Sequence, residues 1–220
     1  MQNCIIGVTG PIAAGKNAAC AILEQKGFVS LDADSLTHRI IEEKQSQILD
    51  SFLPIAAGQG VRLRNADGTI DRKALGKILF ADPEALKKQE TIVHPEVNRL
   101  FEEFITSHTD CPMALNATLL YKIPVLARCQ VVLYIDAPWV WRFFRVKRRN
   151  HLKSAEIFAR FRSQSHIYTQ YCAKNADIYR VRNIGNLGSL EKKIDRFLRY
   201  CEDKGYGKWN KNNHCGLSPR

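Results

Sequence analysis

The feature that most constrains this chain is a glycine-bounded loop close to its start, residues 10–17, which reads GPIAAGKN. It follows a short apolar, β-branched run at residues 4–9 and precedes residues 16–26, whose apolar positions have helical spacing. In the pattern G-x-x-x-x-G-K-[ST], backbone N–H groups at a helix N-terminus surround phosphate groups, and the lysine reaches the β- and γ-phosphates. The sequence therefore predicts strand, phosphate loop and helix. The predicted nucleotide-binding residues are Gly10, Pro11, Ile12, Ala13, Ala14, Gly15, Lys16 and Asn17.

Two residues of the loop depart from that pattern. Pro11 lacks a backbone N–H donor, and Asn17 stands where the pattern has the hydroxyl that binds Mg²⁺. An amide oxygen is also a hard neutral ligand, so we predict Asn17 as a weakened magnesium ligand, direct or through water. The alternative for the whole loop is an ordinary glycine turn with a solvated Lys16.

Further apolar runs alternate with helical patterns along the chain. Strands are expected at residues 28–31, 113–116, 130–135 and 178–181, and a last helix at 190–200. The middle of the chain, between the strands at 28–31 and 113–116, is mostly helical in pattern, and Pro83 and Pro95 are placed there like first-turn prolines. Strands that alternate with helices indicate a parallel sheet. We therefore predict an α/β protein: a P-loop NTPase-type parallel sheet flanked by helices, with a helical insertion and a basic helical lid.

Composition restricts the class of protein and its partners. The 220 residues are 45% apolar, which argues against disorder, and no run approaches the roughly 18 apolar residues that would span a bilayer. The start of the chain lacks the basic region and cleavage site of a signal peptide, so we expect a cytoplasmic protein. The net charge of +11 admits nucleic acid, an acidic membrane surface or a small polyanion such as a nucleotide.

The seven cysteines are odd in number, widely scattered and never in a C-x-x-C spacing. That distribution supports neither a disulfide framework nor a zinc site. Reduced thiols are expected throughout.

The most basic stretch of the chain is residues 142–162, with eight Lys and Arg against the single acid Glu156. Such a face repels itself unless an anion neutralises it, and guanidinium groups suit bidentate contact with phosphate oxygens. In nucleotide kinases a mobile lid of this kind closes arginines over the phosphates and excludes water.

An ordered series of segments between residues 4 and 200 resembles the dephospho-CoA kinase family. The similar segments are IIGVTG at 5–10, LDAD at 31–34 with His38 following, NADGTIDRKALG at 65–76, IVHP at 92–95, VLYIDAP at 132–138, and the lid at 145–164. The resemblance implies phosphorylation of the ribose 3′-hydroxyl of dephospho-CoA, with ATP and Mg²⁺ as cofactors. It implies no nucleic-acid or membrane partner and leaves the oligomeric state open.

The resemblance also implies a domain organisation. A single kinase domain would occupy residues 1–203, with its core at about 1–34, 110–140 and 175–203. The helical substrate subdomain would occupy about 35–109 and the lid about 142–172. Residues 204–220 lie beyond the resemblance, and because they lack apolar periodicity we expect them to form a basic flexible tail.

Candidate site residues follow from the loop, the strand ends and the resemblance. Lys16 is the predicted phosphate-binding catalytic residue, and Asp32, at the end of the second strand, is predicted to accept or orient the proton of the acceptor hydroxyl. The resemblance adds Arg149 as a catalytic and nucleotide-binding lid residue. Asn183, beside Gly185, is implied near the adenine. The substrate contacts that it implies, besides Asp32, are Asp34, His38, Arg72, His94 and Arg160.

Each of these residues also has an ordinary structural explanation. Asp32 and Asp34 could cap a helix, His38 could be packed or solvated, His94 could precede a helix-starting proline, and Asn183 could belong to a turn.

The chain departs from the family at several acidic positions. Asn116 to Lys122 reads NATLLYK where the family typically has D-x-P-L-L-F-E, and Asn150 replaces an aspartate. With Asn17, these changes remove negative charge or the metal-binding hydroxyl and predict weaker metal handling. The other hypotheses are another P-loop nucleoside or nucleotide kinase, and a catalytically weakened P-loop protein that binds nucleic acid or CoA-like ligands through its basic face.

Overall fold

The computed structural model describes residues 4–150, 154–174 and 176–207. The chain divides into two compact units, Met1–Asp32 with Phe101–Arg220, and Ala33–Leu100. The predicted insertion at 35–109, lid at 142–172 and tail at 204–220 remain sequence predictions. Most of that tail, from residue 208 onward, lies outside the described residues.

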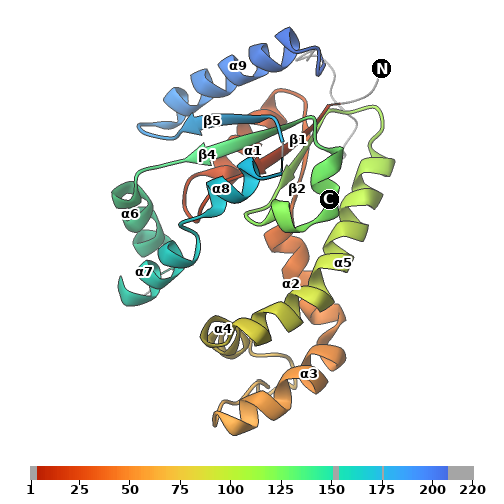
Figure 1. Ribbon diagram of the computed structural model, residues 1–220, viewed down its shortest axis with the longest axis vertical. Coiled ribbons are helices and arrows are strands. Elements are labelled where there is room, and N and C mark those ends of the chain that lie inside the picture. The colour runs from red at the N-terminus through yellow and green to blue at the C-terminus, as the bar shows by residue number, and fades with distance from the viewer. Residues whose placement is uncertain (1–3, 151–153, 175, 208–220) are drawn as a thin grey trace. The chain divides into compact units, whose positions relative to one another are not determined.

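The larger unit is built on a five-stranded sheet (Figure 1). Its strands are β1 (Ile5–Thr9), β2 (Val29–Asp32), β3 (Met113–Asn116), β4 (Val131–Asp136) and β5 (Ile178–Arg182). They lie in the order β2-β3-β1-β4-β5, and every neighbouring pair is parallel. Their near-continuous apolar character suits a parallel sheet covered on both faces. The predicted strands and the α/β class are confirmed.

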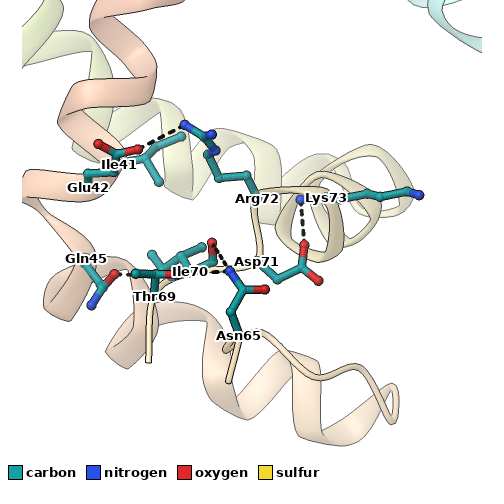
Figure 2. Close-up of a pocket in the computed structure, with 9 residues that line it drawn as sticks. All are labelled: Ile41, Glu42, Gln45, Asn65, Thr69, Ile70, Asp71, Arg72 and Lys73. Atoms are coloured by element: carbon teal, nitrogen blue, oxygen red, sulfur yellow. Dashed lines mark hydrogen bonds and ion pairs between the residues drawn. The ribbon is translucent and has the colours of Figure 1, made fainter. Parts of the chain in front are cut away.

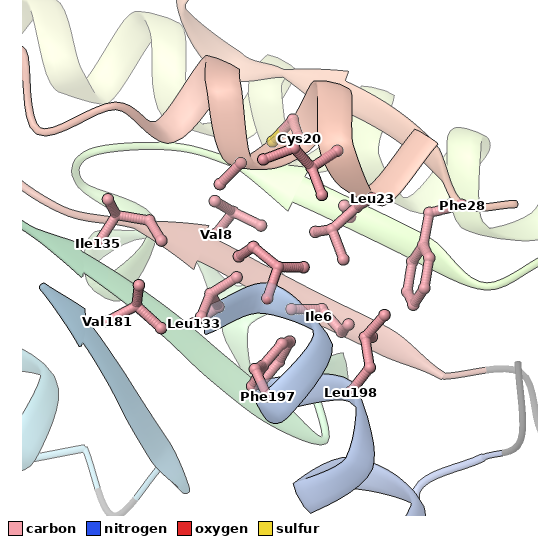
Figure 3. Close-up of a cluster of buried hydrophobic side chains, with 14 of the residues drawn as sticks. Ile6, Val8, Cys20, Leu23, Phe28, Leu133, Ile135, Val181, Phe197 and Leu198 are labelled. Carbon is pink, nitrogen blue, oxygen red and sulfur yellow. The ribbon is translucent and has the colours of Figure 1, made fainter. Parts of the chain in front are cut away.

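One face of the sheet is covered by α1 (Lys16–Gln25) and α9 (Leu187–Asp203), which pack against each other. Because side chains alternate along a strand, Ile6 and Val8 of β1 point to this face. Figure 3 shows them with Leu23 of α1 and Phe197 of α9 in one buried cluster. This packing fixes the start of α1, and with it the end of the phosphate loop.

The opposite face bears Gly7 and Thr9 of β1 together with η1 (Leu120–Lys122) and α8 (Ile167–Cys172). The helices η2 (Pro124–Arg128), α6 (Trp139–Asn150) and α7 (Ser154–Ser163) also follow β3 and β4 along the chain. Thr9 donates from Oγ1 to the Tyr171 hydroxyl at 2.8 Å, and both side chains are fully buried. Burial raises the pKa of Tyr171 well above its usual value. This bond ties α8 to the end of β1, next to the loop.

The smaller unit contains α2 (Ala33–Glu43), α3 (Gln45–Gly58), α4 (Arg72–Ala81) and the first part of α5 (Pro83–Ser107). Its core joins Ile41, Phe52, Leu75 and Ile78, among others. An antiparallel bridge between Arg64 and Ile70 closes the polar turn at residues 65–69. That bridge places the turn directly before α4.

The two prolines of α5 behave differently. Pro83 is the first residue of the helix, as predicted, but Pro95 lies inside it, so the first-turn prediction is wrong there. Val93, Val97 and Phe101 are buried at helical spacing on both sides of Pro95. Their burial outweighs the single backbone hydrogen bond that a proline removes.

The cysteines are mostly apolar core residues. Among the described residues Cys4, Cys20, Cys129, Cys172 and Cys201 are free, and burial raises the pKa of Cys4 and Cys20 to about 12. Cys111 is disulfide-bonded, so the prediction of reduced thiols is wrong at that residue. Spacing along the chain cannot show which sulfur atoms meet in the fold. No helix in the described part of the chain is long and apolar enough to cross a membrane.

Candidate active site

The loop between β1 and α1 is held in conformations that favour glycine. Gly10 and Gly15 have φ angles of 144° and 109°, and Ala13 between them has φ 59°. A Cβ on Gly10 would lie 2.0 Å from the backbone oxygen of Ile135, so no larger residue fits there. Gly15 is the N-cap of α1, which places the helix N-terminus at the end of the loop.

Lys16, the first residue of α1, lies across the inside of this loop. Its side chain is buried, and Nζ donates to the Gly10 backbone oxygen at 3.0 Å. The ammonium group at the end of the loop is therefore hydrogen-bonded to the first residue of the loop. This is where a phosphate-binding lysine must lie, although its contact with phosphate stays a prediction.

Two arginines of α6 hold the loop from outside. Arg142 donates from Nε to the Ile12 oxygen at 2.9 Å, and Arg145 donates from Nη1 to the oxygens of Ala13 and Ala14 at 3.1 and 3.2 Å. The Arg142 guanidinium also stacks on Phe161 of α7, 4.2 Å from the ring centre. Desolvation lowers the pKa of Arg142. Both arginines orient the backbone of the loop, and the sequence did not single them out within the basic run.

A glutamine of the predicted lid accepts a hydrogen bond from one backbone N–H of the loop. Gln164, directly after α7, accepts from the Ile12 backbone N–H through Oε1 at 2.7 Å. Nothing in the sequence pattern marked this residue, because its partner lies 152 positions earlier.

Asn183, predicted near the adenine, uses its amide to support the loop. Its Nδ2 donates to the Ala14 oxygen at 2.8 Å, and the residue is buried. Its backbone oxygen accepts from Nη2 of Arg145 at 3.4 Å. The side chain is thus committed to loop geometry, and a direct adenine contact stays a prediction.

The two predicted lid arginines are located differently. Arg160 is half-buried on α7 and already interacts with other groups of the chain. Arg149 belongs to α6, but its side chain lies outside what the structure describes. Their contacts with phosphate stay predictions.

Three polar residues from distant segments meet at the carboxyl edge of the sheet. Asp32 at the end of β2 and Asn116 at the end of β3 are direct register partners. Asn116 donates from Nδ2 to Oδ1 of Asn17, at the start of α1, at 3.2 Å. Asn116 is only 3% exposed, and within the described residues its Oδ1 has no hydrogen-bond partner. The strand end next to this neutral amide pair carries one half-buried carboxylate, that of Asp32.

These residues fit a magnesium ion that is held mainly by a nucleotide. Mg²⁺ prefers oxygen ligands, keeps several waters, and is usually bound by one or two carboxylates together with substrate phosphates. The edge offers the amide oxygen of Asn17, the Oδ1 of Asn116, which has no partner among the described residues, and the Asp32 carboxylate. Across the described residues no cluster of three or more His, Cys, Asp or Glu could bind a metal alone.

The smaller unit has a pocket of about 450 Å³ of its own (Figure 2). Asp71 caps α4 by accepting from the N–H groups of Lys73 and Ala74 at 2.9 and 3.0 Å. Arg72 pairs with Glu42 at 3.1 Å. The lining residues are Ile41, Glu42, Gln45, Asn65, Thr69, Ile70, Asp71, Arg72 and Lys73.

The remaining predicted substrate contacts lie elsewhere in this unit. Asp34, in the first turn of α2, and His38, one turn further on, are exposed. His94 is half-buried within α5. None of the three lines the pocket, and the structure does not test their contacts with substrate.

A strand, glycine loop and lysine-bearing helix on a five-stranded parallel sheet define the kind of protein, and comparison with known proteins defines the family. The family model for dephospho-CoA kinase matches residues 4–186. This chain belongs to the dephospho-CoA kinase family. The resemblance found in the sequence and the predicted P-loop fold are thereby confirmed.

The matches to similar proteins cover most of this chain and most of the matched chains. That of Treponema denticola is 37% identical over 194 residues, covering 86% of each chain. That of Treponema pallidum is 37% identical, covering 88% of this chain and 93% of its own. A crystal structure from Thermus thermophilus has a TM-score of 0.72 at 32% identity, covering 93% of this chain and 98% of that one.

Proposed function

We propose that this chain transfers the γ-phosphate of ATP to the ribose 3′-hydroxyl of dephospho-CoA, giving coenzyme A and ADP. The observation that carries the proposal is the constrained phosphate loop, with a buried Lys16 across it, in a chain of this family. Phosphoryl transfer needs little covalent chemistry from a protein. It needs the donor and acceptor in line and the charge of the transition state neutralised.

The donor phosphates would bind at the loop and the N-terminus of α1. There the backbone N–H groups and the helix dipole favour negative charge. Lys16 would exchange its bond to the Gly10 oxygen for the β- and γ-phosphates. Because Lys16 is buried, its charge is screened less than that of a surface lysine.

The acceptor hydroxyl would be oriented by Asp32, whose half-buried carboxylate lies at the carboxyl edge of the sheet. A bound Mg²⁺ would supply positive charge to the phosphate oxygens, and Asn17, Asn116 and Asp32 would hold it. Arg149 and Arg160 of the lid would neutralise the transferring group.

Dephospho-CoA carries phosphates that need basic partners. Arg72, which lines the pocket of the smaller unit, would supply a guanidinium group for them. Asp34, His38 and His94 remain further substrate contacts of the proposal. We place the enzyme in the cytoplasm.

The test is coenzyme A formation from Mg²⁺-ATP and dephospho-CoA, with Lys16→Ala as the variant. We expect the wild-type protein to form coenzyme A and the variant to be slower by about 100- to 1000-fold, because it loses a charge that faces the transferring phosphoryl group. Circular dichroism establishes that the variant is folded. Formation no faster than in the variant, at saturating substrates, would contradict the proposal.

Another P-loop nucleoside or nucleotide kinase is the second candidate, because such an enzyme would share the loop and sheet. An ADP-release assay that compares dephospho-CoA with nucleosides and nucleoside monophosphates separates the two. Dephospho-CoA should give the highest kcat/KM.

A further inference from the structure

The Asn17–Asn116 pair has an unusual place in the fold. It lies where the loop, the start of α1 and the carboxyl end of β3 meet, and it joins two segments 99 residues apart through one hydrogen bond of 3.2 Å. Asn116 is almost fully buried and its Oδ1 lacks a partner in the described part of the chain. A buried carbonyl-type oxygen without a partner is costly, and such an atom is often explained by an unseen ion or water.

The charge around the pair is low. Both side chains are neutral at every physiological pH. The adjacent strand end contributes Asp32, and the carboxylate of Asp136, at the end of β4, is already paired with Arg180. A nucleotide triphosphate that enters without a metal therefore meets little negative charge at this edge. With a carboxylate in place of either amide, the same phosphates would be repelled until a cation arrived.

We propose that Asn17 and Asn116 act together as a neutral ligand pair, so that this chain binds ATP almost equally well with and without Mg²⁺. The inference rests on the proposed function for the nucleotide site, and it concerns the order of events there. The nucleotide would bind first on the loop amides and Lys16. The two amide oxygens would then hold the metal against the phosphate oxygens, with the Asp32 carboxylate as the one charged protein group beside them.

The measurement is calorimetric titration of the full chain with adenylyl-imidodiphosphate, which is not hydrolysed, in Mg²⁺ and in EDTA. For the wild-type protein we expect the two dissociation constants to agree within about threefold, because neither amide repels phosphate. Wild-type binding that is more than about tenfold tighter with Mg²⁺ would overturn the inference.

The informative variant is Asn17→Asp, which keeps an acceptor for Asn116 Nδ2 and adds one negative charge. Asn17 is exposed and lies in the first turn of α1, where an acidic residue is favourable, so the variant should fold. Binding in EDTA should weaken by at least about tenfold while binding in Mg²⁺ is retained. An unchanged ratio of the two constants would equally overturn the inference.

A matched control adds the same charge at the other edge of the sheet. Gln130, just before β4, accepts from the Ile5 N–H at 2.6 Å, and Gln130→Glu keeps that acceptor. For Gln130→Glu, the ratio of the dissociation constants in EDTA and in Mg²⁺ should remain that of the wild type. A change in this ratio equal to that of Asn17→Asp would show that net charge alone is responsible. That result too would overturn the proposed role of the pair.

The titration separates this inference from the proposed function because dephospho-CoA is absent. A metal-independent nucleotide affinity in a chain that forms no coenzyme A would contradict the function and leave the amide pair standing. Strongly metal-dependent binding in a chain that does form coenzyme A would overturn the role of the amide pair and leave the proposed function intact. Absence of nucleotide binding in both buffers would overturn both.

Discussion

Gly10 and Gly76 show how differently one residue type can matter. Gly10 has φ 144°, and an added Cβ would lie 2.0 Å from the Ile135 oxygen. Gly76 lies within α4 with nothing within 4 Å of an added Cβ. The first glycine is required by the close approach of β4 to the loop, whereas the second is only a weak point in a helix.

Opposite effects are therefore expected from the same substitution. Gly10→Ala should lower the free energy of unfolding by at least about 2 kcal/mol, because of strain and overlap. Gly76→Ala should raise it by about 0.5–1 kcal/mol, because alanine loses less backbone freedom on folding. Urea denaturation followed by circular dichroism measures both. Equal effects of the two substitutions would contradict the assigned loop geometry.

Asn183 gives a second prediction at this scale. Removing its amide by Asn183→Ala leaves the Ala14 oxygen with only its bond from Arg145, and the loss of one hydrogen bond should cost about 0.5–1.5 kcal/mol of stability. Because Ala14 belongs to the loop, the dissociation constant for ATP should rise as well. A stability loss with unchanged nucleotide affinity would show that the bond serves folding alone.

At the scale of single elements, the start of α4 depends on one side chain. Asp71→Ala removes the acceptor for the N–H groups of Lys73 and Ala74, and an N-cap loss of this kind costs about 1 kcal/mol. Asp71→Asn keeps an acceptor and should stay close to the wild type. Chemical denaturation of the three proteins checks the ordering, and an Asp71→Ala protein as stable as wild type would refute it.

The sequence predicted elements better than it predicted contacts. Strands β1 to β5 and the loop before α1 were readable because apolar spacing and glycine placement are local signals. Pro95 was misjudged because burial on both sides of it is a tertiary effect. Arg142 and Gln164 could not be recognised because their partner in the loop is more than a hundred residues away.

For the molecule as a whole, the net charge of +11 makes acid pH a sensitive condition. Lys44 and Arg99 hold the pKa of Glu96 down, from 4.5 to about 2. A carboxyl whose pKa is lowered by folding stabilises the folded state above its unfolded pKa, and this contribution is lost as pH falls. The relevant window is therefore between about 4.5 and 2.

Glu96→Gln tests this dependence. The variant should melt at a lower temperature than the wild type at pH 7, and the difference should shrink as the pH falls through that window, because the wild-type carboxyl then also becomes neutral. Scanning calorimetry over this range measures both curves. Curves that stay parallel would assign the stabilisation to some other group.

The Ile12 N–H of the loop already has an acceptor, the Oε1 of Gln164. Under the proposed function, a phosphate that took this N–H would have to displace the glutamine, so nucleotide binding would exchange one acceptor for another. Breaking the Gln164 bond would cost free energy, so the apparent affinity for the nucleotide would be lower than its intrinsic affinity for the loop. The same exchange would leave Gln164, directly after α7, without its bond to the loop.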